Sequence, residues 1–402
     1  MTINKTLIDK HLAGEEFGNF SKDFLAAEGS VVSEILSAFR ESFAMSNTEI
    51  WQEIAILDSQ PQMSSELMLV IGISKLMRGE ALGLLWLRAS LSKFPTARNL
   101  HAYFIALCQL AENKEKMKLL LDTVTSFASV KYPDYLSYAH PDYITETYSV
   151  LPYKDRAFLI TLENTFRNAC MRDIFLNGYW SLEPDLEWVE SILSDGDVLI
   201  DIGANAGIYT LSSSKVVGEK GLVYSFEPNP VCVNLVEKSI KLNNLNNIVL
   251  IPEAISNTEG TQELVLYAAS DHNHIKFSDQ SSVVSKSTVI GTAKIKVTTL
   301  DNYFANKKLS KLDIIKIDAE GYEKFVLQGG AEIIKQFKPK LILEINERLF
   351  LPNGYTTEDL LNVLECMDYS IFRLRQNKLV RLTEADFGNR EKSFNIIAVS
   401  KK

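Results

Sequence analysis

Acidic residues and glycines stand in this sequence where a short apolar run ends. The run is Val198 to Ile202, and Asp201, Gly203, Asn205 and Gly207 lie at its end and in the turn after it. An apolar run of this length is typical of a buried parallel strand, and the residues from 208 to 217 predict a helix. A strand that passes through glycines into a helix presents backbone N–H groups and the positive end of the helix dipole to a ligand. The turn is therefore predicted to bind a ligand.

Another acid, Glu227, ends the apolar run from Leu222 to Phe226 and lies twenty residues after Gly207. At the end of the second strand of a nucleotide-binding unit, a carboxylate can accept hydrogen bonds from both ribose hydroxyls. We therefore expect a ligand with a free ribose diol.

The spacing of the glycines separates two classes of ligand. A dinucleotide fingerprint needs glycines at positions 203, 205 and 208, where this chain has Gly203, Asn205 and Ile208. That difference disfavours a nicotinamide oxidoreductase, which stays an alternative on a related fold. The pattern D-x-G-x-N-x-G, followed by an acid after the next strand, resembles the first motif of class I S-adenosylmethionine-dependent methyltransferases.

Further acids follow later predicted strands. Asp318 and Glu320 come directly after the apolar run from Leu312 to Ile317, and Glu344 lies within the run from Lys340 to Ile345. Ligands bind at the carboxyl ends of the strands in open α/β sheets, so these acids are predicted to meet the earlier ones at one edge.

The predicted third strand, Ile248 to Ile251, is followed by Glu253 and Ala254. The loop after this strand borders the nucleobase in this kind of fold, which makes Glu253 a candidate acceptor for an adenine amino group. A solvated loop acid is the alternative.

Strands and helices continue to alternate after Glu227, which is the signature of a doubly wound, mostly parallel sheet. Closing strands are predicted over Tyr369 to Leu374 and Ser393 to Val399, with an antiparallel strand at the C-terminus. A polar insert from Ala268 to Ala293 interrupts the core. It contains Asp271, His272, His274, Asp279, Ser281 and Ser282, and its length predicts an active-site lid or acceptor loop.

Residues 1–150 are predicted to form an all-α domain, either an irregular bundle or a helix-pair repeat. The stretch over residues 131–154 is rich in tyrosine and proline and predicts a loop-rich connector to the second domain. A helix is expected from Asp155 to about Phe175, and the second domain is predicted to span residues 155–402.

Composition narrows the function further. The 402 residues carry a formal net charge of -9, and no run of five basic residues appears, so nucleic acid is not the expected partner. The four cysteines, which include Cys366, lie far apart and predict free buried thiols in a reducing compartment. The charged first thirty residues fit no signal peptide, and the apolar stretches are too short to cross a bilayer, so a cytoplasmic location is expected.

Taken together, several stretches resemble the FkbM-type methyltransferase family over about residues 178–400. They are DIGANAGIYT, SFEPNP, TLDNYF, DIIKIDAEGYEKFVLQGG and LILEIN, in this order. The resemblance implies a class I methyltransferase fold and transfer of a methyl group from S-adenosylmethionine, usually to a hydroxyl oxygen of a sugar, polyketide or similar metabolite.

Two mechanisms remain open for the acceptor, because an alcohol is a weak nucleophile. In one, Asp318 or Glu320, with His274 from the insert, removes the hydroxyl proton. In the other, Asp318 with Glu320, Glu344 or Asn346 holds a Mg²⁺ that binds the acceptor. Direct acid/base chemistry is slightly favoured. An exposed loop histidine is the alternative for His274.

A different class of function also fits the sequence. The methyltransferase fold could be catalytically silent, with the helical N-terminus docking a protein partner or a second copy of the chain. The intact set of Asp201, Gly203, Gly207 and Glu227 argues against a silent site.

Overall fold

The structure of the protein is a computed structural model. It describes residues 65–77, 83, 86, 87, 89, 90, 102, 148–153, 158–163, 168, 170, 171, 174, 184–267, 273–276, 289–376, 378–383 and 393–401. The chain divides into two compact units. One comprises residues 1–152, 162–166 and 174–178, and the other, here called the C-terminal unit, comprises residues 153–161, 167–173 and 179–402.

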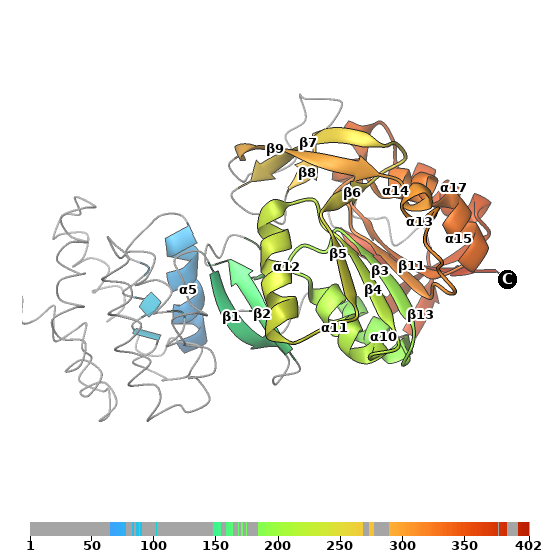
Figure 1. The fold of residues 1–402 in the computed structure, drawn as a ribbon. Coiled ribbons are helices and arrows are strands. Elements are labelled where there is room, and N and C mark those ends of the chain that lie inside the picture. The colour runs from blue at the N-terminus through green and yellow to red at the C-terminus, as the bar shows by residue number, and fades with distance from the viewer. Residues whose placement is uncertain are drawn as a thin grey trace, which may run out of the picture. The chain divides into compact units, whose positions relative to one another are not determined.

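An eight-stranded sheet forms the centre of the C-terminal unit (Figure 1), in the order β13-β12-β14-β11-β10-β3-β4-β5. Its strands are β3 (Val198–Ile202), β4 (Leu222–Phe226), β5 (Ile248–Ile251), β10 (Ile314–Ile317), β11 (Lys340–Ile345), β12 (Tyr369–Arg375), β13 (Lys378–Arg381) and β14 (Phe394–Ser400). The five strands from β11 to β5 pair in parallel, and β14 runs antiparallel to β11. The predicted class I methyltransferase sheet, mostly parallel with an antiparallel C-terminal strand, is confirmed. The short strand β13 extends it beyond the prediction.

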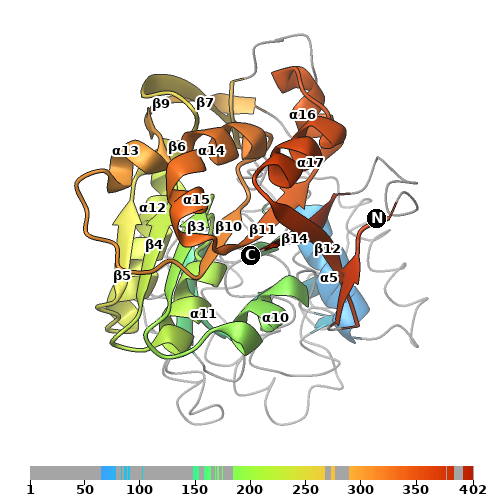
Figure 2. The same ribbon diagram turned by 90° about the vertical axis from the view of Figure 1, so that its right-hand side faces the viewer.

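Helices cover both faces of this sheet because its central strands are apolar on both sides. Every residue of β3 and β10 is buried. In Figures 1 and 2, α10 (Pro184–Ile192), α11 (Ile208–Val217) and α12 (Pro230–Leu242) lie on one side. On the other side lie α13 (Leu300–Phe304), α14 (Glu323–Gly329), α15 (Ala331–Phe337) and α17 (Thr357–Cys366). None of the described helices is long and apolar enough to span a membrane.

A second, four-stranded sheet lies beside the carboxyl edge of the first, in the order β6-β9-β7-β8 (Figure 1). It contains β6 (Glu253–Ile255), β7 (Gly260–Tyr267), β8 (His274–Ile275) and β9 (Val289–Thr298). The predicted insert from Ala268 to Ala293 therefore contributes β8 and the start of β9. Its residues 268–272 and 277–288, with Asp271, His272, Asp279, Ser281 and Ser282, lie outside the described residues.

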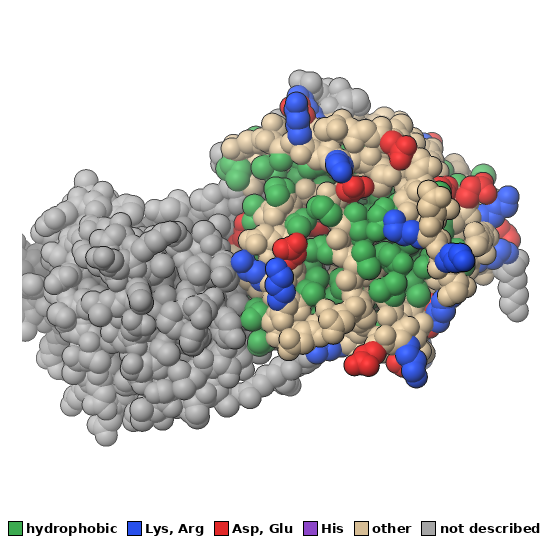
Figure 3. All heavy atoms as spheres, in the orientation of Figure 1, with side chains coloured by type: hydrophobic (Ala, Val, Ile, Leu, Met, Phe, Trp, Pro, Cys, Tyr) green, Lys and Arg blue, Asp and Glu red, His purple; other side chains and the backbone are tan. Residues whose placement is uncertain are grey.

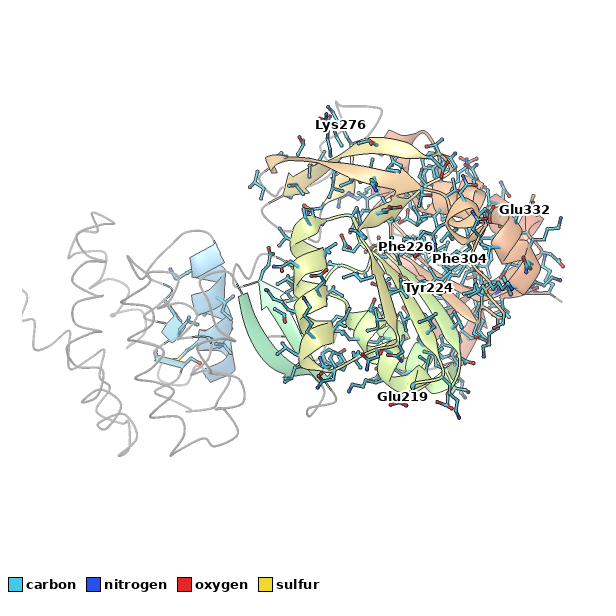
Figure 4. All side chains as sticks on the ribbon, viewed as in Figure 1. Glu219, Tyr224, Phe226, Lys276, Phe304 and Glu332 are labelled. Carbon is cyan, nitrogen blue, oxygen red and sulfur yellow. The ribbon has the colours of Figure 1, made fainter. Side chains whose placement is uncertain are left out.

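Aromatic rings fill the core between β4 and α13. Tyr224 and Phe304 meet edge to face, with ring centroids 4.9 Å apart (Figure 4). Phe226 packs against Tyr303 at the same distance. Such pairs add about 0.5–1.5 kcal/mol each beyond the burial of their area, so they fix the end of β4 from which Glu227 projects.

The predicted helix from Asp155 to Phe175 is wrong over its first part, where the structure has strand β2 (Phe158–Glu163). Its backbone N–H groups bond to side chains of α12 and its C-cap: Leu159 N to Asn243 Oδ1 at 2.7 Å and Thr161 N to Ser239 Oγ at 2.9 Å. These tertiary hydrogen bonds override local helix propensity. The predicted connector likewise ends in a strand, β1 (Tyr148–Tyr153).

The N-terminal prediction falls mostly outside the described residues. Within them, α5 (Ser65–Met77) is helical, as expected for this part of the chain. Cys170 and Cys232 are free and buried, but Cys366 is exposed at the end of α17, which corrects the expectation that the thiols are buried.

One close approach of backbone gives a test of this packing. A Cβ atom added to Gly329 would lie 2.0 Å from the carbonyl oxygen of Ser256, whereas one added to Gly291 would meet nothing within 4 Å. We expect Gly329→Ala to lower the free energy of unfolding by about 2 kcal/mol or more, since backbone must move. Gly291→Ala should change it by less than about 0.5 kcal/mol. Urea unfolding of both variants checks this, and equal effects would contradict the packing described.

Candidate active site

The turn after β3 is tied to the end of β4 by backbone hydrogen bonds. The N–H groups of Gly203 and Ala204 donate to the carbonyl of Phe226, at 2.9 and 3.1 Å. The next N–H, of Asn205, donates to Glu227 Oε2 at 2.7 Å, and Asn229 N donates to Glu227 Oε1 at 2.8 Å. Both carboxylate oxygens of Glu227 are thus oriented by backbone donors.

Burial controls the ionisation of the two acids on this side of the site. It raises the pKa of Glu227 to about 7, while the N–H groups of Asn229 and Asn205 act in the opposite direction. It also raises the pKa of Asp201 to about 6, against the hydrogen bond from Thr210 Oγ1 to Asp201 Oδ2 at 2.6 Å. Asp201 therefore anchors α11 to β3 from beneath the turn.

Gly203 and Gly207 have backbone roles. Both have positive φ, 79° and 83°, which favours glycine. A Cβ at Gly203 would lie 1.8 Å from the carbonyl oxygen of Asp318, and one at Gly207 would lie 2.9 Å from Val236 Cγ2. The absence of a side chain at Gly203 lets the end of β10 come against the turn.

A buried lysine that sequence reasoning missed stands beside Asp318. Lys316 is 2% exposed, and its Nζ donates to Asp318 Oδ2 at 3.0 Å and lies 5.1 Å from the ring centroid of Tyr209. Its positive charge also lowers the pKa of the neighbouring Asp201 and Glu344 against the effect of burial. A charged residue inside the otherwise apolar run Ile-Ile-Lys-Ile was the signal available in the sequence.

Three of the predicted acids converge near this lysine. One carboxylate oxygen each of Asp318, Glu320 and Glu344 lies within 4.8 Å of the others. The pKa of Glu344 is raised well above its usual value, first by burial and then by the charges of Asp318 and Glu323. Asn346 follows β11 and precedes α16 (Glu347–Phe350).

Glu323 is the acid of this block that holds the loop together. It is fully buried, and its Oε1 accepts from Ala319 N at 2.8 Å and Gly321 N at 3.4 Å. The hydroxyl of Tyr355 donates to the carbonyl of Gly321 at 2.9 Å and lies 3.3 Å from Glu323 Oε2. Helix α14 begins at Glu323, directly after the loop that this carboxylate bonds.

His274 lies on β8 and is 5% exposed, so it is not the exposed loop histidine of the alternative interpretation. Its Nδ1 lies 2.9 Å from the carbonyl oxygen of Ile275, which can only accept, so Nδ1 carries the proton. Its Nε2 lies 3.4 Å from the hydroxyl of Tyr267.

These groups border one cleft with about 950 Å³ of empty space. Of the predicted site residues, Asp201, Gly203, Asn205, Glu227, Glu253, Ala254, His274, Asp318 and Glu320 line it. Gly207, Glu344 and Asn346 are not among its lining residues. Glu253 is half-buried and lies 3.8 Å from Lys296 Nζ.

Asn168 reaches the cleft loop from a stretch in which the sequence predicted a helix but no site residue. This buried amide donates from Nδ2 to Asn205 Oδ1 at 3.2 Å and accepts from Met171 N at 2.9 Å. Cys232 Sγ lies 3.6 Å from the same oxygen. Asn205 has a φ of 49°, a backbone conformation that non-glycine residues rarely adopt. Asn168 and Cys232 therefore hold the side chain of a residue whose backbone is in this unusual conformation.

Comparison with known protein families gives a match over the part of the chain that contains most of these cleft residues. Residues 201–371 match the family model described as Methyltransferase FkbM domain. The chain contains an FkbM methyltransferase domain. This stretch starts at the acid that anchors α11 and ends within β12, so it includes the cleft acids from β3 to β11.

Individual relatives are similar to part of the chain. One is a probable cobalt-precorrin-6B C(15)-methyltransferase (decarboxylating) of Sulfurisphaera tokodaii, 28% identical over 142 residues, which are 34% of this chain and 71% of that protein. Another is Methyltransferase sdnD of Sordaria araneosa, 24% identical over 35% of this chain and 62% of that protein. The chain is also similar to the solved structure of methyltransferase FkbM from Methylobacillus flagellatus KT. This match covers 77% of this chain and 60% of that one, with 15% identity and a TM-score of 0.33.

The buried Glu323 predicts a pH-dependent stability. Burial raises its pKa from 4.5 to about 7, so the folded state binds this proton more tightly than the unfolded state. Its contribution therefore decreases as the pH rises from about 4.5 to about 7. Glu323→Gln keeps an acceptor for Ala319 and removes the titration. As the pH rises from 5 to 8, the free energy of unfolding of the variant should increase by on the order of 1–3 kcal/mol relative to that of the wild type. Urea unfolding measures both proteins at both pH values. The same difference in free energy of unfolding between Glu323→Gln and wild type at pH 5 and at pH 8 would contradict this.

The contact of Asn168 with the cleft loop predicts an effect on ligand affinity. Asn168→Ala should weaken the binding of S-adenosylhomocysteine about 5- to 30-fold, on the basis of about 1–2 kcal/mol for a lost buried hydrogen bond that orders the loop. Asn243→Ala is a matched control, because this amide bonds the backbone of Leu159 and does not line the cleft. Isothermal titration measures both. Equal affinity in Asn168→Ala and wild type would refute the role of Asn168.

Proposed function

We propose that the chain is an S-adenosylmethionine-dependent methyltransferase that methylates a hydroxyl oxygen of a sugar, glycan or secondary metabolite. One observation carries the proposal: the turn of Gly203 and the carboxylate of Glu227 line the same cleft as Asp318, which comes from the adjacent strand. A ligand site and a proton-accepting group are therefore held on neighbouring strands.

The residues on the β3 and β4 side fit the cofactor. Glu227 is fixed by two backbone donors and retains lone pairs for the ribose diol. Glu253 and Ala254 border the position expected for adenine. When bound, S-adenosylmethionine supplies a methyl group on a sulfonium for in-line transfer to an acceptor atom held about 3 Å away.

Asp318 is the group best placed to accept the hydroxyl proton. The ammonium of Lys316 holds Asp318 by one oxygen, Oδ2. Glu320 lines the cleft beside it, and His274 lines the cleft from the second sheet. A general base of this kind contributes about 10²–10⁴ in rate.

A bound Mg²⁺ is the second candidate, and the spacing of Asp318, Glu320 and Glu344 supports it. Carboxylate oxygens are the ligands that Mg²⁺ prefers. Against it, Lys316 already supplies a positive charge to Asp318. We favour direct acid/base chemistry for this reason.

A cytoplasmic location, and a protein partner or second copy bound by residues 1–150, remain predictions.

The first test is isothermal titration with S-adenosylhomocysteine and, separately, NAD. We expect micromolar binding of the former and none of NAD. Glu227→Ala should weaken binding at least 10-fold, because the ribose loses its acceptor. Glu219→Ala, at an exposed acid (Figure 4), is the control and should bind as wild type. Absence of binding by the wild type would overturn the proposal and favour a silent scaffold.

The second test separates the base from the metal. Asp318→Asn should leave the affinity for S-adenosylhomocysteine within about 3-fold of wild type, since Asp318 is assigned to the acceptor side, and lower methyl transfer about 10²–10⁴-fold. Titration of the wild type with Mg²⁺ alone should give no binding heat. Binding of Mg²⁺ that Asp318→Asn and Glu344→Gln both abolish would instead establish the metal.

A further inference from the structure

A second cavity adjoins the cleft at the second sheet. It has about 850 Å³ of empty space and shares Ile275 and Tyr322 with the cleft. Tyr322 donates its hydroxyl to Gln262 Oε1 at 3.4 Å, and its ring packs against Phe325 with centroids 5.2 Å apart. The two spaces therefore lie on either side of the buried side chains of Ile275 and Tyr322.

The polar groups of this cavity are amides and hydroxyls in the main. They come from Ser256, Asn257, Thr258, Gln262 and Asn353. In the described part of the chain, the Gln262 amide nitrogen makes no hydrogen bond, and Asn353 uses only its Nδ2, toward the carbonyls of Gly321 and Leu349. A donor and an acceptor thus remain for a ligand, which suits hydroxyl groups because they both donate and accept.

The charges of the cavity cancel. Lys276 is its one cation among the described residues, and Lys276 Nζ lies 2.8 Å from Glu263 Oε2 (Lys276 is labelled in Figure 4). A phosphate or carboxylate ligand would need a cation of its own. An apolar chain would leave these half-exposed amides without hydrogen-bond partners. An uncharged, hydroxyl-rich ligand fits both constraints.

We propose that the second cavity is a subsite for an uncharged glycosyl unit next to the methylated one, so that the acceptor is a neutral oligosaccharide or glycoside of at least two units. This rests on the proposed function and adds the extent and charge of the acceptor. The half-buried ring of Phe325 offers an apolar surface to a sugar face.

The probe is an array of immobilised neutral di- to tetrasaccharides, the matching monosaccharides and sialylated oligosaccharides. Methyl transfer from tritiated S-adenosylmethionine is measured on it. We expect transfer to neutral oligosaccharides, at least 10-fold above the matching monosaccharides. Transfer to none of the oligosaccharides, equal transfer to monosaccharides, or a preference for the sialylated compounds overturns the proposal.

Variants locate the effect in the cavity. Gln262→Ala should raise the KM for the preferred oligosaccharide about 3- to 10-fold, the loss of one or two neutral hydrogen bonds, with the affinity for S-adenosylhomocysteine unchanged. Gln336→Ala, at an exposed position of α15, is the matched control. An unchanged KM in Gln262→Ala contradicts the subsite. Absence of S-adenosylhomocysteine binding by the wild type would instead contradict the proposed function itself.

Discussion

The close approach of the Gly203 backbone to the carbonyl of Asp318 is the constraint on which the site depends. A Cβ at position 203 would lie 1.8 Å from that oxygen, so no other residue leaves the ends of β3 and β10 in contact. Ile202 and Ile317 are register partners, and Asp318 N donates to Ile202 O at 3.0 Å. The ligand turn and the acidic loop are consequently parts of one rigid edge, and the chemistry on either side cannot separate without breaking the sheet.

That edge concentrates acids in a buried place, and the structure compensates them in two different ways. Glu227 and Glu323 receive backbone N–H groups, which fixes their oxygens and shapes the loops around them. Asp318 receives the ammonium of Lys316 instead, and Asp318 lines the cleft. On the molecular face of Figure 3, by contrast, side chains of both charges are scattered between hydrophobic ones.

Much of the sheet and of the cleft could be predicted from the sequence because both depend on local patterns. Apolar runs such as Val198 to Ile202 identify buried strands, and glycines and acids at their ends mark the ligand edge. What the sequence did not reveal depends on distant contacts. Strand β2 forms because α12 side chains bond its backbone, and Asn168 acts only through its contact with Asn205. The structural role of Glu323 likewise depends on the fold, which buries its carboxylate against the N–H groups of Ala319 and Gly321.

The measurement that tests the central claim most directly is a crystal structure of the protein with S-adenosylhomocysteine. The account predicts both ribose hydroxyls within hydrogen-bonding distance of the Glu227 carboxylate, the adenine beside Glu253 and Ala254, and the sulfur facing Asp318. A ligand bound elsewhere, or a ribose turned away from Glu227, would contradict the assignment of this cleft as the site of methyl transfer.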